Sequence, residues 1–122
     1  MTRDQLARAI YQRSLLRGEF TLRSGAKSDR YFDKYLFESD PELLAEIAQA
    51  LARLVPEDTE MLAGLELGGV PLAVMVGQLT GLPVVFVRKE AKPYGTMRLA
   101  EGGDIAGRKL LVIEDVVTSG GQ

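Results

Sequence analysis

The sequence predicts an α/β fold built around a parallel β-sheet. Residues 61–65, 84–87 and 110–113 are short apolar runs, typical of parallel strands that are buried on both faces. Between the first two runs, residues 70–80 are apolar nearly all round, which favours a buried helix. A strand, a helix and a second strand in this order indicate a βαβ unit, the building block of a parallel sheet.

Three further elements precede this sheet. A helix is expected over residues 2–17, because its first residues have the spacing of a capping box and apolar residues then recur at helical spacing. Residues 19–22 and 30–37 contain β-favouring aromatic residues and predict a hairpin or two short strands. Asp40 and Pro41 then predict the start of a second helix, whose apolar stripe is Leu44, Ile47, Ala48, Leu51 and Val55.

Residues 88–109 predict a long loop without secondary structure, since they hold five glycine or proline positions and no helical period. Loops longer than about 12 to 15 residues are uncommon in compact domains unless they are functional or disordered. The first residues of this loop, 88–95, concentrate cations on a flexible arm. Such cations can close over a diphosphate and stabilise charge on a leaving group. An ordinary solvated basic loop is the alternative.

Residues 110–122 form the most informative motif, an apolar strand that runs into two acids and then a small hydroxyl-bearing turn. Ligands of open parallel sheets bind just beyond the carboxyl ends of the strands, where Glu114 and Asp115 stand. Carboxylates accept hydrogen bonds only, so this pair can hold the vicinal hydroxyls of a ribose. The next residues offer hydroxyls and open backbone amides to a phosphate. A buried strand ending in a polar turn is the alternative, and the adjacent acidic pair weighs against it.

The composition excludes several functions. The chain has no histidine and no cysteine, which rules out histidine acid/base catalysis, Ser-His or Cys-His nucleophiles and the usual zinc sites. A metal would be hard and oxygen-ligated, such as Mg²⁺ carried by a diphosphate. The net charge of −2 argues against a nucleic-acid partner. No segment reads as a signal peptide or as a membrane span of about 20 apolar residues, so we expect a soluble cytoplasmic protein without a membrane partner.

The motif at residues 110–122 closely resembles the signature of type I phosphoribosyltransferases, which bind 5-phosphoribosyl 1-diphosphate (PRPP). The resemblance implies that Glu114 and Asp115 contact the ribose. It also implies one domain, with an amino-terminal helix and hood (residues 1–37) before a sheet core (residues 38–122). Because the sequence stops inside this motif, we expect an incomplete domain that lacks its carboxyl-terminal part and is inactive alone. The implied 5-phosphate loop is Val116, Val117, Thr118, Ser119, Gly120, Gly121 and Gln122.

Three other blocks resemble orotate phosphoribosyltransferases. Residues 88–95 resemble that family's flexible loop, Arg-Lys-x-x-Lys-x-His-Gly, although Tyr94 stands where the histidine is common. Residues 20–33 resemble its orotate-binding hood, and residues 64–73 its diphosphate loop. The implied PRPP-binding residues of the flexible loop are Arg88, Lys89, Lys92 and Tyr94. The implied orotate contacts are Arg23, Tyr31, Phe32 and Thr118, and the implied diphosphate-loop residues are Leu67, Gly68 and Gly69.

The combined resemblance implies transfer of a phosphoribosyl group from PRPP to orotate in pyrimidine biosynthesis. It implies that Lys92, Asp115 and Glu114 are catalytic and that Mg²⁺ arrives with PRPP, with no direct metal ligand from the protein. It also implies a homodimer in which the loop from Arg88 to Gly103 reaches the partner's active site. Three alternatives stay open: another PRPP-dependent base phosphoribosyltransferase, a non-catalytic PRPP-binding regulatory domain, and an inert fragment.

Overall fold

The computed structural model describes residues 1–121, and these divide into two compact units. The first unit is Met1–Glu46 and the second begins at Ile47. Helix α3 (Pro41–Ala52) crosses the boundary between them. Each unit has its own internal contacts, so each is a separate framework for the side chains that it carries.

The first unit begins with helix α1 (Arg3–Ser14), and the predicted capping box is confirmed. The amide of Gln5 donates to Thr2 Oγ1 at 3.1 Å, and the amide of Thr2 donates to Gln5 Oε1 at 2.8 Å. The helix ends three residues before the predicted Arg17, because Leu15 is already extended. Residues 15–17 instead pair with a second strand, and this pairing overrides their helical spacing.

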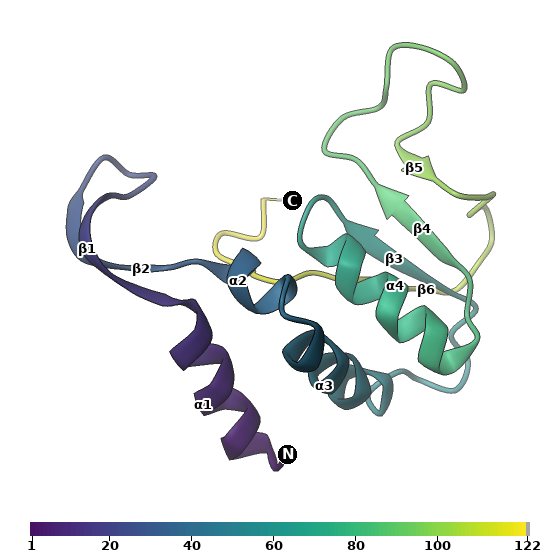
Figure 1. Ribbon diagram of the computed structural model, residues 1–122. Helices are drawn as coiled ribbons and strands as arrows, with labels where there is room; N and C mark the ends of the chain where they lie inside the picture. The colour runs from purple at the N-terminus through teal and green to yellow at the C-terminus, as the bar shows by residue number, and fades with distance from the viewer. Residues whose placement is uncertain (122) are drawn as a thin grey trace. The chain divides into compact units, whose positions relative to one another are not determined.

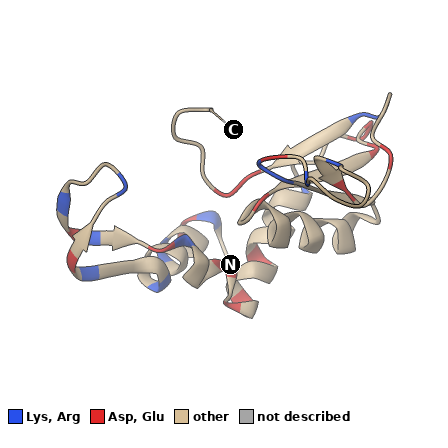
Figure 2. Cartoon of the chain, turned by 90° about the horizontal axis from the view of Figure 1, so that it is seen from above, with Lys and Arg blue, Asp and Glu red and all other residues tan. Residues whose placement is uncertain are grey.

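The predicted hairpin is confirmed as β1 (Leu15–Thr21) and β2 (Lys27–Phe32), which pair antiparallel (Figure 1). Its second strand does not continue to residue 37 as predicted. Asp33 accepts a hydrogen bond from the Tyr35 amide at 3.1 Å and caps a short helix, α2 (Lys34–Glu38). Lysine and arginine positions recur along the hairpin (Figure 2).

Helix α3 starts where the sequence predicts. Asp40 Oδ1 accepts hydrogen bonds from the amides of Glu42 at 3.1 Å and Leu43 at 3.2 Å. The helix ends at Ala52, before the predicted Val55, and the next residues close single turns. Val55 precedes Pro56, and the residue before a proline is disfavoured in helical geometry.

The second unit is a four-stranded sheet in the order β5-β4-β3-β6. Strand β3 (Met61–Leu65) lies parallel to both β4 (Val84–Val87) and β6 (Leu110–Ile113), and all three predicted strands are confirmed with their boundaries. Helix α4 (Gly69–Thr80) lies along one face of the sheet (Figure 1) and ends at Gly81 in the left-handed conformation. One core cluster on the sheet consists of the buried residues Met61, Ala63 and Val85, against which the partly buried Val87 and Leu110 pack.

The segment between β4 and β6 is not wholly irregular, which corrects the prediction for residues 88–109. Strand β5 (Ala100–Glu101) pairs antiparallel with β4. Ahead of it the chain folds back on itself, since the Arg88 amide donates to the Leu99 carbonyl at 2.8 Å and the Lys92 amide to the Arg98 carbonyl at 3.3 Å. This segment is therefore a hairpin-like arm that projects beyond the sheet (Figure 1).

No helix in the described part of the chain is long and apolar enough to cross a membrane.

Candidate active site

Charged residues follow three parallel strands at one edge of the sheet. Glu66 comes directly after β3, Arg88 after β4 and Glu114 after β6. The strand register pairs Leu65 with Val87 and Gly64 with Ile113, so the three strand ends lie side by side. Ligands of parallel sheets bind at this edge, which makes it the candidate site.

Gly69 packs the predicted diphosphate loop closely against the end of the strand that precedes the two acids. A Cβ atom on Gly69 would overlap the carbonyl oxygen of Ile113 and would lie 3.4 Å from Glu114 Cα. A Cβ atom on Gly64 would in turn lie 2.7 Å from the Gly69 carbonyl oxygen. These positions therefore require glycine, and the resulting backbone contact fixes the start of α4 against the end of β6. Gly68 is buried beside Gly69, whereas Leu67 is exposed.

The two acids at the end of β6 lie in a half-buried environment. Glu114 Oε1 accepts a hydrogen bond from the Asp115 amide at 2.9 Å. Both carboxylate oxygens of Asp115 are inaccessible to solvent. The pair offers carboxylate oxygens at the end of the strand, but those of Asp115 do not face solvent in this conformation, so contact with ribose hydroxyls requires the Asp115 side chain to turn outward.

The predicted phosphate loop follows as an exposed segment without regular secondary structure. Ser119 Oγ accepts a hydrogen bond from the Gly121 amide at 3.3 Å. Gly120 between them has a φ of 73°, a conformation that favours glycine. The side chains of Val116 and Val117 are exposed, and Gln122 lies outside the described residues.

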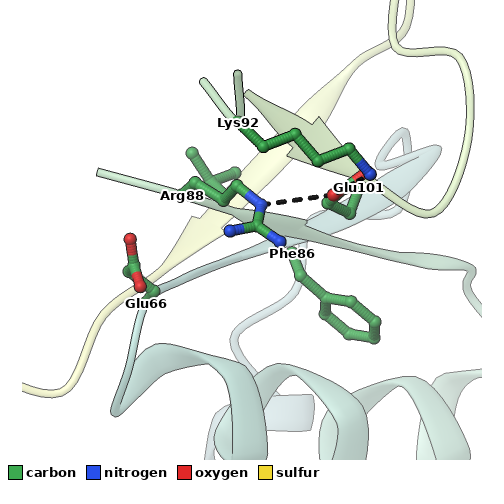
Figure 3. A pocket seen from close by; sticks show the side chains of 6 residues that line it. Glu66, Phe86, Arg88, Lys92 and Glu101 are labelled. Atoms are coloured by element: carbon green, nitrogen blue, oxygen red, sulfur yellow. Dashed lines mark hydrogen bonds and ion pairs between the residues drawn. The ribbon is translucent and has the colours of Figure 1, made fainter. Parts of the chain in front are cut away.

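A pocket of about 480 Å³ opens beside the ends of β3 and β4. Two cations from the predicted loop converge there on one carboxylate oxygen (Figure 3). Lys92 Nζ lies 2.6 Å from Glu101 Oε2, and Arg88 Nε lies 3.2 Å from the same atom. The pocket is lined by Glu66, Phe86, Val87, Arg88, Lys92 and Glu101.

These contacts shift two pKa values. The hydrogen bond from Lys92 lowers the pKa of the Glu101 carboxyl below its usual 4.5, and Arg88 adds to the effect. The hydrogen bond with Glu101 raises the pKa of Arg88, to which the nearby Tyr94 phenol also contributes. Lys92 Nζ lies 5.7 Å from the centroid of the Tyr94 ring, which places a cation over an aromatic face.

The lowered pKa of Glu101 predicts a pH dependence of stability. Its ionised form is favoured in the folded state, so the stabilisation is present above the unfolded-state pKa and lost as pH falls through the folded-state value. We expect the unfolding free energy of the unaltered chain to decrease as the pH falls below 4.5. The unfolding free energy of Glu101→Gln should decrease less over the same range. Urea unfolding between about pH 6 and pH 3 measures this difference. Parallel pH profiles for the two proteins would contradict the assignment.

Sequence reasoning missed four residues that line the pocket: Glu66, Phe86, Val87 and Glu101. Glu66 Oε1 accepts a hydrogen bond from the Lys89 amide at 2.5 Å, whereas the Lys89 residue itself is exposed. Phe86 belongs to a strand that reads only as core. Glu101 lies on a strand of two residues, which is too short to give a periodic signal. Glu101 therefore left no signal in the sequence, whereas Glu66 directly follows β3 and could have been found by the rule that places Glu114 at this edge.

The predicted orotate contacts of the hood lie in the first unit. Arg23 occupies the exposed turn of the hairpin. Tyr31 stacks on Phe20 with ring centroids 5.7 Å apart, while Phe32 lies 6.3 Å from Phe37. Consecutive strand residues point to opposite faces, so the structure does not bring Tyr31 and Phe32 together on one face of β2.

Comparisons with known proteins identify the family. No family model matches the chain. A curated orotate phosphoribosyltransferase from Nocardioides sp. is 59% identical over 106 residues, which are 87% of this chain and 59% of that protein. A crystal structure of the Mycobacterium tuberculosis orotate phosphoribosyltransferase with Fe(III) dicitrate has a TM-score of 0.79 and 32% identity, covering 97% of this chain and 69% of that one. The chain belongs to the orotate phosphoribosyltransferase family.

Membership confirms the predicted fold of the type I phosphoribosyltransferases. The orotate phosphoribosyltransferase of Methanopyrus kandleri is 40% identical over 122 residues, 99% of this chain and 66% of that protein. A second M. tuberculosis structure, in complex with PRPP, has a TM-score of 0.77 and 29% identity, covering 97% of this chain and 67% of that one. The chain spans 58% to 59% of the length of the first three curated relatives.

Proposed function

We propose that the full-length gene product transfers the 5-phosphoribosyl group from PRPP to orotate, giving orotidine 5′-monophosphate and diphosphate for pyrimidine nucleotide synthesis. The contact between Gly69 and the end of β6 is the observation that carries this proposal. It brings the segment that we assign to the diphosphate close to the segment that we assign to the ribose, which supports a substrate that carries a diphosphate on a ribose. Membership of the orotate phosphoribosyltransferase family supports the choice of base.

In this proposal the substrate lies along the carboxyl edge of the sheet. Glu114 and Asp115 accept hydrogen bonds from the ribose hydroxyls, and residues 116–122 bind the 5-phosphate. The diphosphate lies near Leu67, Gly68 and Gly69, where the first turn of α4 has no acidic residue. The amides of that turn and the helix dipole favour an anion there.

The chemistry that we propose is positioning combined with charge stabilisation. As the bond from ribose C1 to diphosphate breaks, positive charge develops on the sugar and negative charge on the leaving group. Lys92, Arg88 and Lys89 counter the negative charge, and Tyr94 can donate a hydrogen bond. Orotate is already an anion, so a strong general base is not needed, which agrees with a chain that has no histidine.

A magnesium ion belongs to this proposal as a companion of the substrate. Within residues 1–121 no group of three or more acidic, histidine or cysteine side chains is arranged to hold a metal ion. Glu114 and Asp115 offer carboxylate oxygens, the donor type that Mg²⁺ takes, and Mg²⁺ commonly completes its shell with water and substrate phosphates. When bound, Mg²⁺ would neutralise charge on the diphosphate.

The remaining parts of the proposal concern the base and the assembly. Arg23 supplies a cation for the anionic base, Thr118 a hydroxyl, and Tyr31 or Phe32 an aromatic wall. We also propose a cytoplasmic homodimer in which the arm from Arg88 to Gly103 serves the partner's site. No nucleic acid or membrane takes part in this scheme.

An assay of the full-length gene product tests the proposed reaction. Orotate consumption is followed with PRPP and Mg²⁺, and thermal stabilisation is measured with orotate, adenine, uracil and hypoxanthine in turn, since a ligand of the native state raises the melting temperature. We expect turnover and selective stabilisation by orotate. Stabilisation by another base would favour a different phosphoribosyltransferase. PRPP binding without turnover on any base would favour a regulatory domain. Absence of PRPP binding would favour an inert protein.

Asp115→Asn is expected to weaken PRPP binding at least tenfold. The substitution keeps the shape of the side chain and removes its charge, and a hydrogen bond to a charged group contributes about 1.5 to 3 kcal/mol. Calorimetry with PRPP and Mg²⁺ measures the change in the full-length gene product. Asp104→Asn is the matched control, because Asp104 is exposed and accepts a hydrogen bond from the nearby Ala106 amide at 3.2 Å. Equal affinities of the Asp115 variant and the unaltered protein would contradict the ribose role.

A further inference from the structure

The cations of the arm already have an anionic partner in their own chain. Glu101 Oε2 accepts from Lys92 Nζ at 2.6 Å and from Arg88 Nε at 3.2 Å (Figure 3). The Lys92 side chain is 16% exposed and that of Glu101 is 23% exposed, so this ion pair is shielded. Two other ion pairs of the second unit are more open: the side chains of Arg108 and Glu60 are 54% and 43% exposed, and those of Lys109 and Asp58 are 64% and 67% exposed. The Lys92–Glu101 pair is therefore better protected than an ordinary surface contact.

The two residues of this ion pair belong to different kinds of segment, a sheet strand and an exposed turn. Glu101 belongs to β5, which is paired with β4 opposite Phe86. Lys92 belongs to the projecting arm, which is closed by the bonds from the Lys92 amide to Arg98 and from the Met97 amide to Tyr94. Met97 has a φ of 55°, an uncommon conformation for a residue other than glycine. The ion pair thus links the exposed turn of the arm to the sheet.

We propose that Glu101 is a latch that holds Lys92 and its arm against the sheet in the ligand-free protein, and that a diphosphate releases the arm by replacing Glu101 as the partner of Lys92. The role rests on the proposed function, in which Lys92 serves the diphosphate. Two anions cannot share one ammonium at full strength, so part of the binding free energy of the diphosphate is used to break the ion pair. Glu101 acts through Lys92 and is a positioning residue.

The first part of the test needs no ligand. Hydrogen exchange is measured at the Lys92 and Met97 amides in Glu101→Gln, in the unaltered protein and in Glu90→Gln, all as full-length gene products. Glu90 is an exposed acid of the same arm, so its substitution changes the net charge equally without touching either cation. We expect about three- to tenfold faster exchange in Glu101→Gln only, because partly exposed ion pairs contribute modest stabilisation.

The second part measures binding of inorganic diphosphate with Mg²⁺ by calorimetry. Glu101→Gln is expected to bind about three- to tenfold more tightly than the unaltered protein, since it removes the partner that competes with the diphosphate for Lys92. Glu90→Gln should stay within about twofold. In a Lys92→Met background the gain from Glu101→Gln should shrink to less than about twofold, because the two residues act as one unit.

Each outcome decides the proposal. Unchanged exchange in Glu101→Gln would overturn the latch, as would unchanged or weaker diphosphate binding, or a gain that persists without Lys92. The exchange measurement does not depend on the proposed enzyme activity. Faster exchange together with no PRPP binding by the unaltered protein would contradict the proposed function and the release step, but not the ion pair's hold on the arm.

Discussion

Lys92→Met is expected to lower kcat of the full-length gene product about 100-fold, because removing one group that stabilises transition-state charge costs roughly 100- to 1,000-fold. PRPP affinity should change by less than about threefold. In the ground state Lys92 exchanges Glu101, which it contacts at 2.6 Å, for the diphosphate, and the two interactions nearly offset each other. Lys92 then stabilises the transition state more than the ground state only through the charge that develops on the leaving group. Steady-state kinetics with a separate calorimetric measurement of PRPP binding resolves the two effects.

Lys109→Met is the matched control for this experiment. Lys109 loses the same charge, but it lies ahead of β6 and pairs with Asp58 at 3.1 Å, at the opposite end of that strand from the acids. We expect its kcat to stay within about twofold of the unaltered protein, as for most exposed side chains away from a site. A Lys92 variant with normal kcat and a raised KM would identify Lys92 as a binding residue and would contradict its role on the leaving group.

The elements that the sequence predicted best are those whose burial decides their structure. Strands β3, β4 and β6 are short apolar runs with turn residues on both sides, so pattern and packing specify the same boundaries. Local pairing was harder to foresee. Residues 15–17 continue a helical pattern, yet they pair with β2, and Asp33 starts a helix inside a predicted strand. Both errors arise where a tertiary pairing or a cap outweighs a weak local preference.

The candidate site was predictable only where it follows strand ends directly. Glu114 and Arg88 could be assigned to one edge of the sheet, because parallel strands share that edge. Glu101 could not, since its place in the pocket depends on a two-residue strand that folds back on β4. The sequence also contains no indication that Arg88 and Lys92 pair with Glu101 in the ligand-free protein. The motifs therefore predict a substrate site at this edge of the sheet, whereas the pairing of Lys92 and Arg88 with Glu101 emerges only from the structure.

Gly69→Ala is expected to reduce both stability and turnover. A Cβ atom would overlap the carbonyl oxygen of Ile113, and this neighbour is strand backbone that cannot rotate away. Overpacking of this kind costs about 1 to 3 kcal/mol, more than alanine gains over glycine in helix propensity. The helix start and the strand end would have to separate, and a displacement of about 1 Å in a catalytic site can cost on the order of 100-fold in rate. Urea unfolding measures the stability, and kcat is measured well below the melting temperature.

Gly77→Ala separates damage to the site from damage to the fold. Gly77 lies in the same helix, and a Cβ atom there would lie 2.6 Å from Val84 Cγ2, a side-chain atom at the start of β4 and away from the acidic edge. The tightest neighbour here is a side-chain atom that can shift, and the nearest backbone atom, the Leu82 carbonyl oxygen, lies 3.1 Å away rather than in direct overlap. We therefore expect a smaller loss of stability and a kcat within about threefold of the unaltered protein. If Gly69→Ala kept full turnover, or if both variants lost turnover equally, the contact between Gly69 and β6 would not organise the site. A selective loss in Gly69→Ala would instead tie catalysis to the backbone contact that holds the diphosphate loop beside Glu114 and Asp115.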